Sequence, residues 1–136
     1  MAYKYSKAKA VVLGSETIIN QVTTGLVSSS VIAAQSTIMN RLNTSASYNL
    51  DYTHYFIGID TLNATGAVTV YLPNASGSVA GRSYVIKDEG GAADINNIII
   101  QASGSNTVDG FEAVYIESPY ASMNVYTDGV SKWFIY

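Results

Sequence analysis

The chain has 136 residues, no cysteine and a net charge of −3 at neutral pH, and only 12% of its residues are charged. Without cysteine there is no disulfide framework and no thiolate metal site. An average domain has about 25% charged residues, so this surface either consists of uncharged polar groups or is covered by partners. The charge is also uneven: residues 1–50 sum to +3 and residues 51–136 to −6, which indicates two parts with different partners.

Residues 1–50 are predicted to form an extended N-terminal arm. Ser, Thr and β-branched residues dominate residues 10–50, and Gly14 and Gly25 interrupt them, which lowers helix propensity. A short helix over residues 33–42 is the alternative, because Ile38 and Leu42 have helical spacing.

The start of this arm is basic and aromatic. Its candidate binding residues are Tyr3, Lys4, Tyr5, Lys7 and Lys9. Three lysines are too few for a nucleic-acid site, so the acidic surface of a protein neighbour is the expected partner, with a solvated chain end as the alternative. No signal peptide is visible, and no stretch reaches the ~20 apolar residues of a membrane span, so no membrane partner is expected.

Residues 51–136 are predicted to form a β domain. Short β-branched and aromatic runs predict seven strands, at residues 55–60, 68–72, 83–87, 97–101, 113–116, 123–126 and 133–136. Turn residues separate these runs, and Asp128-Gly129 is the best hairpin signal, with a loop longer than two residues. Regular short strands with turns between them predict an all-β fold of the sandwich or barrel type.

Residues with catalytic or metal-binding chemistry are few. His54 is the only histidine, and it lies among aromatic residues at the start of a strand, where packing explains it. The acidic cluster Asp88, Glu89 and Asp94 matches no calcium loop and is expected to be an acidic turn. A glycosidase pair could be drawn from the remaining carboxylates, including Glu112 and Glu117, but the sequence does not pair them. No catalytic residue, metal site or cofactor is therefore predicted.

Tyrosine is abundant, with eleven in the chain. Tyr buries a large area at low entropic cost and keeps a polar tip, so it suits protein interfaces and sugar-binding faces. Ordinary filling of strands is the alternative, because Tyr also favours sheets. With so few charges, interface use is the favoured interpretation.

An ordered series of short segments resembles the knob-type β domains of tailed-bacteriophage structural proteins. The segments are Val68-Thr69-Val70-Tyr71-Leu72-Pro73, Ala80-Gly81-Arg82-Ser83-Tyr84-Val85-Ile86-Lys87-Asp88, Asn96-Asn97-Ile98-Ile99-Ile100, Asp109-Gly110, Pro119-Tyr120-Ala121-Ser122, Val125-Tyr126-Thr127-Asp128-Gly129 and Trp133. The resemblance covers roughly residues 55–136. Knob domains of this type belong to tail needles, tail-fibre tips, head fibres and capsid decoration proteins.

This resemblance implies an antiparallel, jelly-roll-like β-sandwich knob that forms homotrimers on the virion surface and is not an enzyme. About fifty residues precede the knob, without the sustained heptads of a shaft. We therefore expect a capsid decoration (cement) protein that binds the major capsid protein through its arm and bridges capsomers. The candidate trimer-interface residues are Tyr71, Tyr84, Ile86 and Trp133. The alternative is the receptor-binding tip or knob of a tail needle or short fibre.

Overall fold

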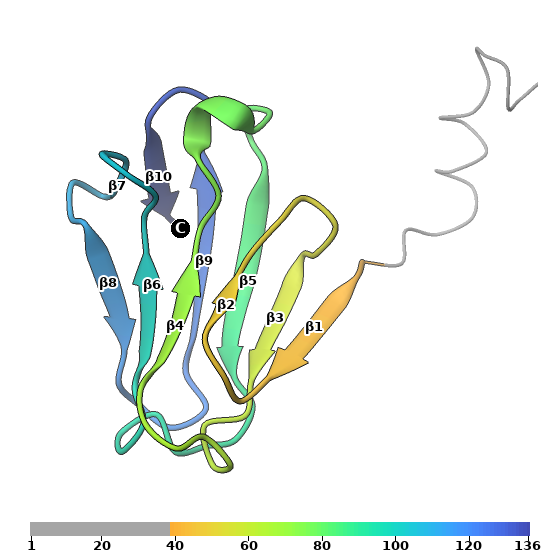
Figure 1. Cartoon of the computed structure of the whole chain (residues 1–136), viewed down its shortest axis with the longest axis vertical. Coiled ribbons are helices and arrows are strands. Elements are labelled where there is room, and N and C mark those ends of the chain that lie inside the picture. Colours follow the sequence, from red (N-terminus) through yellow and green to blue (C-terminus); the bar gives the residue numbers. More distant parts are fainter. Residues whose placement is uncertain (1–38) are drawn as a thin grey trace, which may run out of the picture. The chain divides into compact units, whose positions relative to one another are not determined.

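The computed structural model describes residues 39–136, in which ten strands form two sheets (Figure 1). The strands are β1 (Arg41–Thr44), β2 (Tyr48–Asn49), β3 (Phe56–Ile59), β4 (Val68–Tyr71), β5 (Ser83–Asp88), β6 (Ile98–Gln101), β7 (Thr107–Val108), β8 (Ala113–Ile116), β9 (Ser122–Thr127) and β10 (Lys132–Ile135). A single 3₁₀ turn, η2 (Ala75–Gly77), interrupts them. The all-β prediction is confirmed, and each of the seven predicted strands coincides with an observed one.

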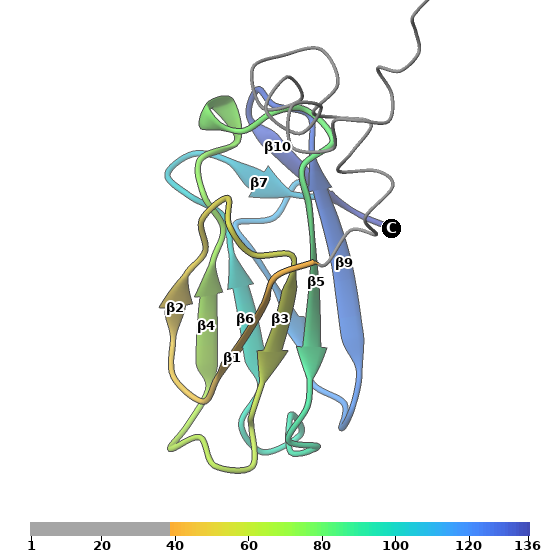
Figure 2. The same ribbon diagram turned by 90° about the vertical axis from the view of Figure 1, so that its right-hand side faces the viewer.

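The two sheets face each other across one hydrophobic core (Figure 2). The six-stranded sheet has the order β1-β3-β5-β9-β10-β7, and the four-stranded sheet has the order β2-β4-β6-β8. From β1 to β6 the chain alternates between the sheets, so that each strand is followed by one in the opposite layer.

This alternation makes both sheets mixed, whereas the sequence had predicted antiparallel ones. The pairs β1–β3, β3–β5, β2–β4, β4–β6 and β7–β10 are parallel, and only β5–β9, β9–β10 and β6–β8 are antiparallel. From β1 to β6, each crossover to the other layer and back re-enters a sheet in the earlier direction, so consecutive strands of that sheet run parallel there. The predicted hairpin at Asp128-Gly129 does join β9 to β10, through a four-residue turn in which Gly129 has φ of 76°.

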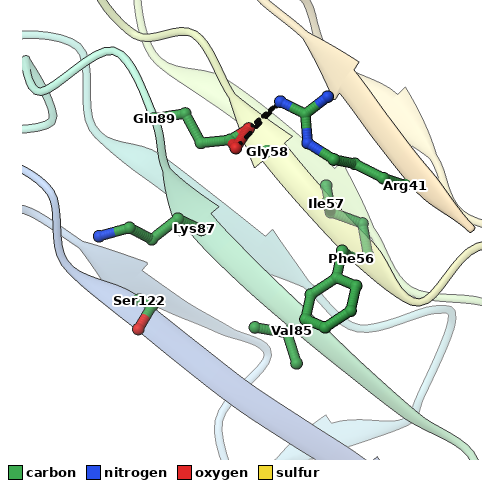
Figure 3. A pocket seen from close by; sticks show the side chains of 8 residues that line it. All are labelled: Arg41, Phe56, Ile57, Gly58, Val85, Lys87, Glu89 and Ser122. Atoms are coloured by element: carbon green, nitrogen blue, oxygen red, sulfur yellow. Dashed lines mark hydrogen bonds and ion pairs between the residues drawn. The ribbon is translucent and has the colours of Figure 1, made fainter. Parts of the chain in front are cut away.

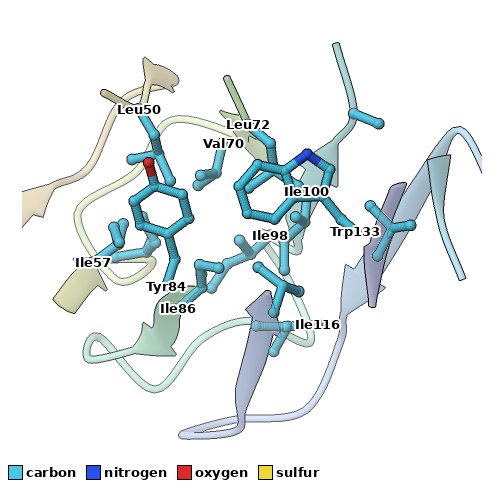
Figure 4. Packing of buried hydrophobic residues seen from close by; sticks show 14 of the residues in the cluster. Leu50, Ile57, Val70, Leu72, Tyr84, Ile86, Ile98, Ile100, Ile116 and Trp133 are labelled. Atoms are coloured by element: carbon cyan, nitrogen blue, oxygen red, sulfur yellow. The ribbon is translucent and has the colours of Figure 1, made fainter. Parts of the chain in front are cut away.

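The core is built from the inward-facing positions of both sheets (Figure 4). Strand residues alternate between the two faces, so residues two apart enter the core together. In β4, Val68 and Val70 are buried, while Tyr71 is exposed. In β5, Tyr84 and Ile86 are buried together with Asp88.

The compact unit spans Met39–Tyr136. It thus includes β1 and β2, which lie within the range expected to be the arm, residues 1–50. Of the alternative helix over residues 33–42, the last residues belong to strand β1 or its approach, and the rest lies outside the described residues. Within residues 39–136, no helix has the length and apolar character to cross a membrane.

Candidate functional site

Three of the four expected trimer-interface residues lie in the core of the single chain. Tyr84, Ile86 and Trp133 are completely buried, and the rings of Tyr84 and Trp133 pack 5.6 Å apart (Figure 4). The Tyr84 hydroxyl donates a 2.8 Å hydrogen bond to the backbone carbonyl of Asp51, and burial raises the pKa of Tyr84 to about 12. These side chains stabilise the unit itself and are not available to a second chain, which corrects the prediction.

Tyr71, the fourth residue, lies on a surface that the sequence analysis had not assembled. It points away from the core on the four-stranded sheet and is 43% exposed. The register places it beside Asn49 and Gln101, and it places Ile99 between Thr69 and Tyr115. We call this surface the neutral face, and its outward residues are Asn49, Thr69, Tyr71, Ile99, Gln101, Ala113 and Tyr115.

None of the residues of the neutral face is charged. Acidic residues lie instead at its margin: Asp51 follows β2, and Glu112 and Glu117 flank β8. An uncharged, aromatic centre with a polar rim is the usual anatomy of a protein interface. Alternation along β4, β6 and β8 was the sequence signal for this face, because the residues next to buried Val and Ile must point outward.

The outer surface of the six-stranded sheet is different around β1, β3 and β5, because it is charged there. A hollow of about 270 Å³ is lined by Arg41, Phe56, Ile57, Gly58, Val85, Lys87, Glu89 and Ser122 (Figure 3). Its charges are already partnered: Arg41 Nη2 lies 2.5 and 3.0 Å from the two Glu89 carboxylate oxygens, and Lys87 donates to the backbone carbonyl of Tyr120. This arrangement ties β1 to the end of β5 across β3, ties β5 to the turn before β9, and leaves no free cation for a ligand within the hollow.

The predicted acidic cluster is divided by the structure into three different environments. Asp88 is completely buried, Glu89 pairs with Arg41, and Asp94 is exposed. The Asp88 carboxylate accepts hydrogen bonds from the Thr61 hydroxyl and from the backbone N–H groups of Gly90, Gly91, Ala93 and Tyr120. Among the described residues no three His, Asp or Glu side chains are placed to hold a metal ion.

Tyr120 is displayed on the turn that Asp88 organises. Its backbone N–H donates to Asp88 at 2.9 Å, and it adopts φ of 59°, which is unusual for a residue other than glycine. The ring is 63% exposed and lies so close over Gly91 that any side chain there would overlap it. The turn therefore presents an exposed aromatic side chain that packs over Gly91.

The other candidates for chemistry do not form a site. His54 Nδ1 lies 3.3 Å from Asp51 Oδ1 within the turn between β2 and β3, and its ring packs edge-on against Tyr48. Glu112 and Glu117 stand at opposite ends of β8, five residues and roughly 16 Å apart along an extended strand. Their backbone positions are farther apart than the roughly 5–9.5 Å between the two carboxyl groups of glycosidases, and an odd spacing along a strand points the two side chains to opposite faces.

The arm residues Tyr3, Lys4, Tyr5, Lys7 and Lys9 lie outside the described residues. Comparison of the chain with protein-family models and with curated protein sequences finds no match.

Proposed function

We propose that this protein is a non-enzymatic structural component of a tailed-bacteriophage virion. In this proposal it is a homotrimeric decoration (cement) protein with a jelly-roll-like knob on the capsid surface. Its basic N-terminal segment binds the major capsid protein, and the trimer bridges adjacent capsomers. Neither nucleic acid nor a membrane is a proposed partner.

The observation that supports this proposal is the exposure of many aromatic side chains on a unit whose own core is complete. Its own fold leaves these rings in solvent: Tyr52, Phe56, Tyr71, Phe111, Tyr115, Tyr120, Tyr126 and Tyr136. Only 12% of the residues of the chain are charged. Aromatic residues are enriched in the centres of protein interfaces and charged residues are depleted there, so the surface suits contacts with other subunits.

The distribution of charge supports different roles for the N-terminal segment and for residues 39–136. Residues 39–136 contain four Lys or Arg and nine Asp or Glu residues, a net charge of −5, whereas Lys4, Lys7 and Lys9 give the start of the chain a positive charge. A trimer presents three such basic segments. Three weak contacts on one particle bind far more tightly than one, because the second and third become intramolecular.

The copy number of the protein on purified virus particles tests this proposal. Quantitative mass spectrometry against the major capsid protein would give it. Hundreds of copies per particle are expected of a decoration protein. A handful of copies, such as three to eighteen, would overturn the decoration role and place the protein at the tail vertex.

A second candidate is the receptor-binding tip of a tail needle or short fibre, and the exposed ring of Tyr120, which packs over Gly91, favours it. An aromatic ring held on a rigid turn can stack on a sugar without losing side-chain entropy. Binding on a glycan array, lost in Tyr120→Ala but kept in Tyr136→Ala, is the expected result for this role. An array without any signal would count against it.

A further inference from the structure

We propose that the neutral face is the surface through which copies of this chain meet around the threefold axis. This inference rests on the proposed homotrimer and adds which side of the unit faces the axis. The occupant of the face is thus a second copy of the same chain. The neutral face replaces the expected interface of Tyr84, Ile86 and Trp133, because these three side chains are buried in the core.

The charge of the unit restricts where its copies can touch. Each unit of residues 39–136 carries a net charge of −5, so copies repel one another over most of their surface. Contact is favourable only where no like charges are brought together, since such pairs inside an interface cost several kcal/mol. The neutral face meets this condition in all seven of its residues, and its acidic neighbours Asp51, Glu112 and Glu117 stay at the margin.

Threefold symmetry adds a second condition, which the same face meets. Near the axis of a homotrimer each side chain lies beside its own copies, so a charged side chain there would face like charges. Asn, Gln, Thr and Tyr side chains both donate and accept hydrogen bonds, so each can pair with its own copies. Asn49, Thr69 and Gln101 supply such groups, and Tyr71 and Tyr115 add exposed aromatic area at 43% and 51%.

The part of the six-stranded sheet around the hollow does not meet these conditions. Arg41, Lys87 and Glu89 lie on its outer surface around the hollow (Figure 3). Burying that surface against copies of itself would desolvate an ion pair and a lysine that solvent now reaches. Burying such an ion pair usually gives little or no net stabilisation, so the surface around the hollow offers no comparable gain.

The test places carboxylates on the neutral face of the full-length chain. Tyr71→Asp with Tyr115→Asp puts six negative charges around the axis of a trimer. The control is Tyr136→Asp, which adds one carboxylate per subunit at a residue that is 61% exposed and packs against Tyr126 of the six-stranded sheet. Molar mass is measured by light scattering and sedimentation over a wide range of concentration, and Trp133 fluorescence reports whether each variant is folded.

The expected result is a trimeric wild type, a trimeric control and a folded, monomeric double variant, with the midpoint of association shifted by about a hundredfold or more. A monomeric wild type at all concentrations would overturn both this inference and the proposed homotrimer. A double variant that remains trimeric would overturn the assignment of the face and leave the homotrimer intact. Equal dissociation of the control would also overturn the assignment.

Cross-linking gives a second test that leaves the face uncharged. Because the chain has no cysteine, Tyr115→Cys introduces a single thiol per subunit, and Tyr136→Cys is the control. Under mild oxidation, covalent dimers are expected to form at least about tenfold faster for Tyr115→Cys, because the axis brings its copies together. Equal rates for the two variants would contradict the proposal even if the aspartate variants failed to fold.

Discussion

The Thr61 hydroxyl donates a 2.6 Å hydrogen bond to a carboxylate oxygen of Asp88, and both residues are completely buried. Thr61 follows β3 and Asp88 ends β5, so the contact joins two turns that extend from neighbouring strands. The backbone N–H of Ala92 donates in turn to the Thr61 hydroxyl at 2.8 Å. This end of the unit is therefore held by a buried polar network around a single carboxylate.

Replacing Asp88 with asparagine should destabilise the unit severely. The two carboxylate oxygens accept from Thr61 and four backbone N–H groups, and an amide nitrogen in place of either oxygen would face these donors. A loss of about 3 kcal/mol in the free energy of unfolding is expected, measured by chemical denaturation with Trp133 fluorescence. The control is Asp94→Asn at an exposed position, where less than about 0.5 kcal/mol is expected. Similar losses in both variants would contradict the role of the network.

Stability should also depend on acid pH through Asp88. Burial alone would raise the pKa of this carboxyl, but hydrogen bonds from Thr61 and from the backbone of Tyr120, Gly91 and Ala93 hold the pKa below its ordinary value of 3.8. Because the folded pKa is the lower one, the stabilisation is present above pH 3.8 and is lost as the pH falls through the folded pKa.

The measurement is the free energy of unfolding from neutral pH down to pH 2. In Asp88→Asn the free energy of unfolding should fall less over this range than in the wild type. Some dependence remains in that variant, because hydrogen bonds from Thr53 and Lys132 also lower the pKa values of Asp51 and Asp128. Curves of equal slope for the two proteins would show that Asp88 does not govern the acid response.

Gly58 and Gly90 should respond differently to replacement by alanine. A Cβ on Gly90 would overlap the backbone nitrogens of Thr61 and Leu62, which cannot move without distorting the turn. A Cβ on Gly58 would overlap only the carboxylate of Glu89, which can swing away at the cost of its half-exposed pair with Arg41.

Gly90→Ala should therefore cost about 2–3 kcal/mol in the free energy of unfolding. Gly58→Ala should cost about 1 kcal/mol or less, because exposed ion pairs contribute little. Chemical denaturation of both variants measures the difference. The reverse order would mean that the ion pair, and not the turn, is the more important constraint.

Removing the Tyr84 hydroxyl should weaken the fold and leave association unchanged. Tyr84→Phe loses one partly buried hydrogen bond to the Asp51 carbonyl, for which about 1 kcal/mol is expected. The pKa of Tyr84 is raised from 10.0 to about 12, so its contribution is present below pH 10 and is lost as the pH rises toward 12. The stability of Tyr84→Phe should accordingly depend less on pH over this range than that of the wild type. A change in the molar mass of this variant in solution would instead indicate that Tyr84 lies in the interface.

Deletion of residues 1–20 tests the arm, since it removes three of the seven Lys and Arg residues. A folded trimer that no longer binds capsids is expected, as judged by co-sedimentation with particles stripped of the protein. The control for charge is the full-length chain with Lys4, Lys7 and Lys9 changed to Glu, which should bind as poorly as the deletion. Full binding by the deletion variant would exclude the anchoring role.

The strands could be predicted because short apolar runs are bounded by turn residues. Val68–Tyr71 precedes Pro73, and Ala113–Ile116 follows Asp109-Gly110, so both strands are visible in the sequence. Strand β1 was missed because Leu42 is its only large apolar residue, and β2 and β7 have two residues each. Parallel pairing could not be predicted, because alternation shows which face a residue occupies and not the direction of the neighbouring strand.

The interface prediction failed for a different reason. Tyr84 and Ile86 are two apart and share a face, so the pattern correctly indicates burial but does not say whether the chain or a partner provides the cover. Thr69 and Tyr71 share the opposite face of β4 from Val68 and Val70, and this contrast identifies outward positions. The rest of the neutral face depends on which strands become neighbours, which only the register shows.

The alternation of the first six strands between the two layers also has a kinetic consequence. Neighbours such as β4 and β6 are separated along the chain by a whole strand of the opposite sheet, so few contacts can form locally. Proteins with a high relative contact order fold more slowly, because a large loop must close, at a cost in entropy, before the paired strands stabilise the chain. The unit is therefore expected to refold more slowly than a meander of hairpins of equal length, with the β9–β10 hairpin as its main local nucleus.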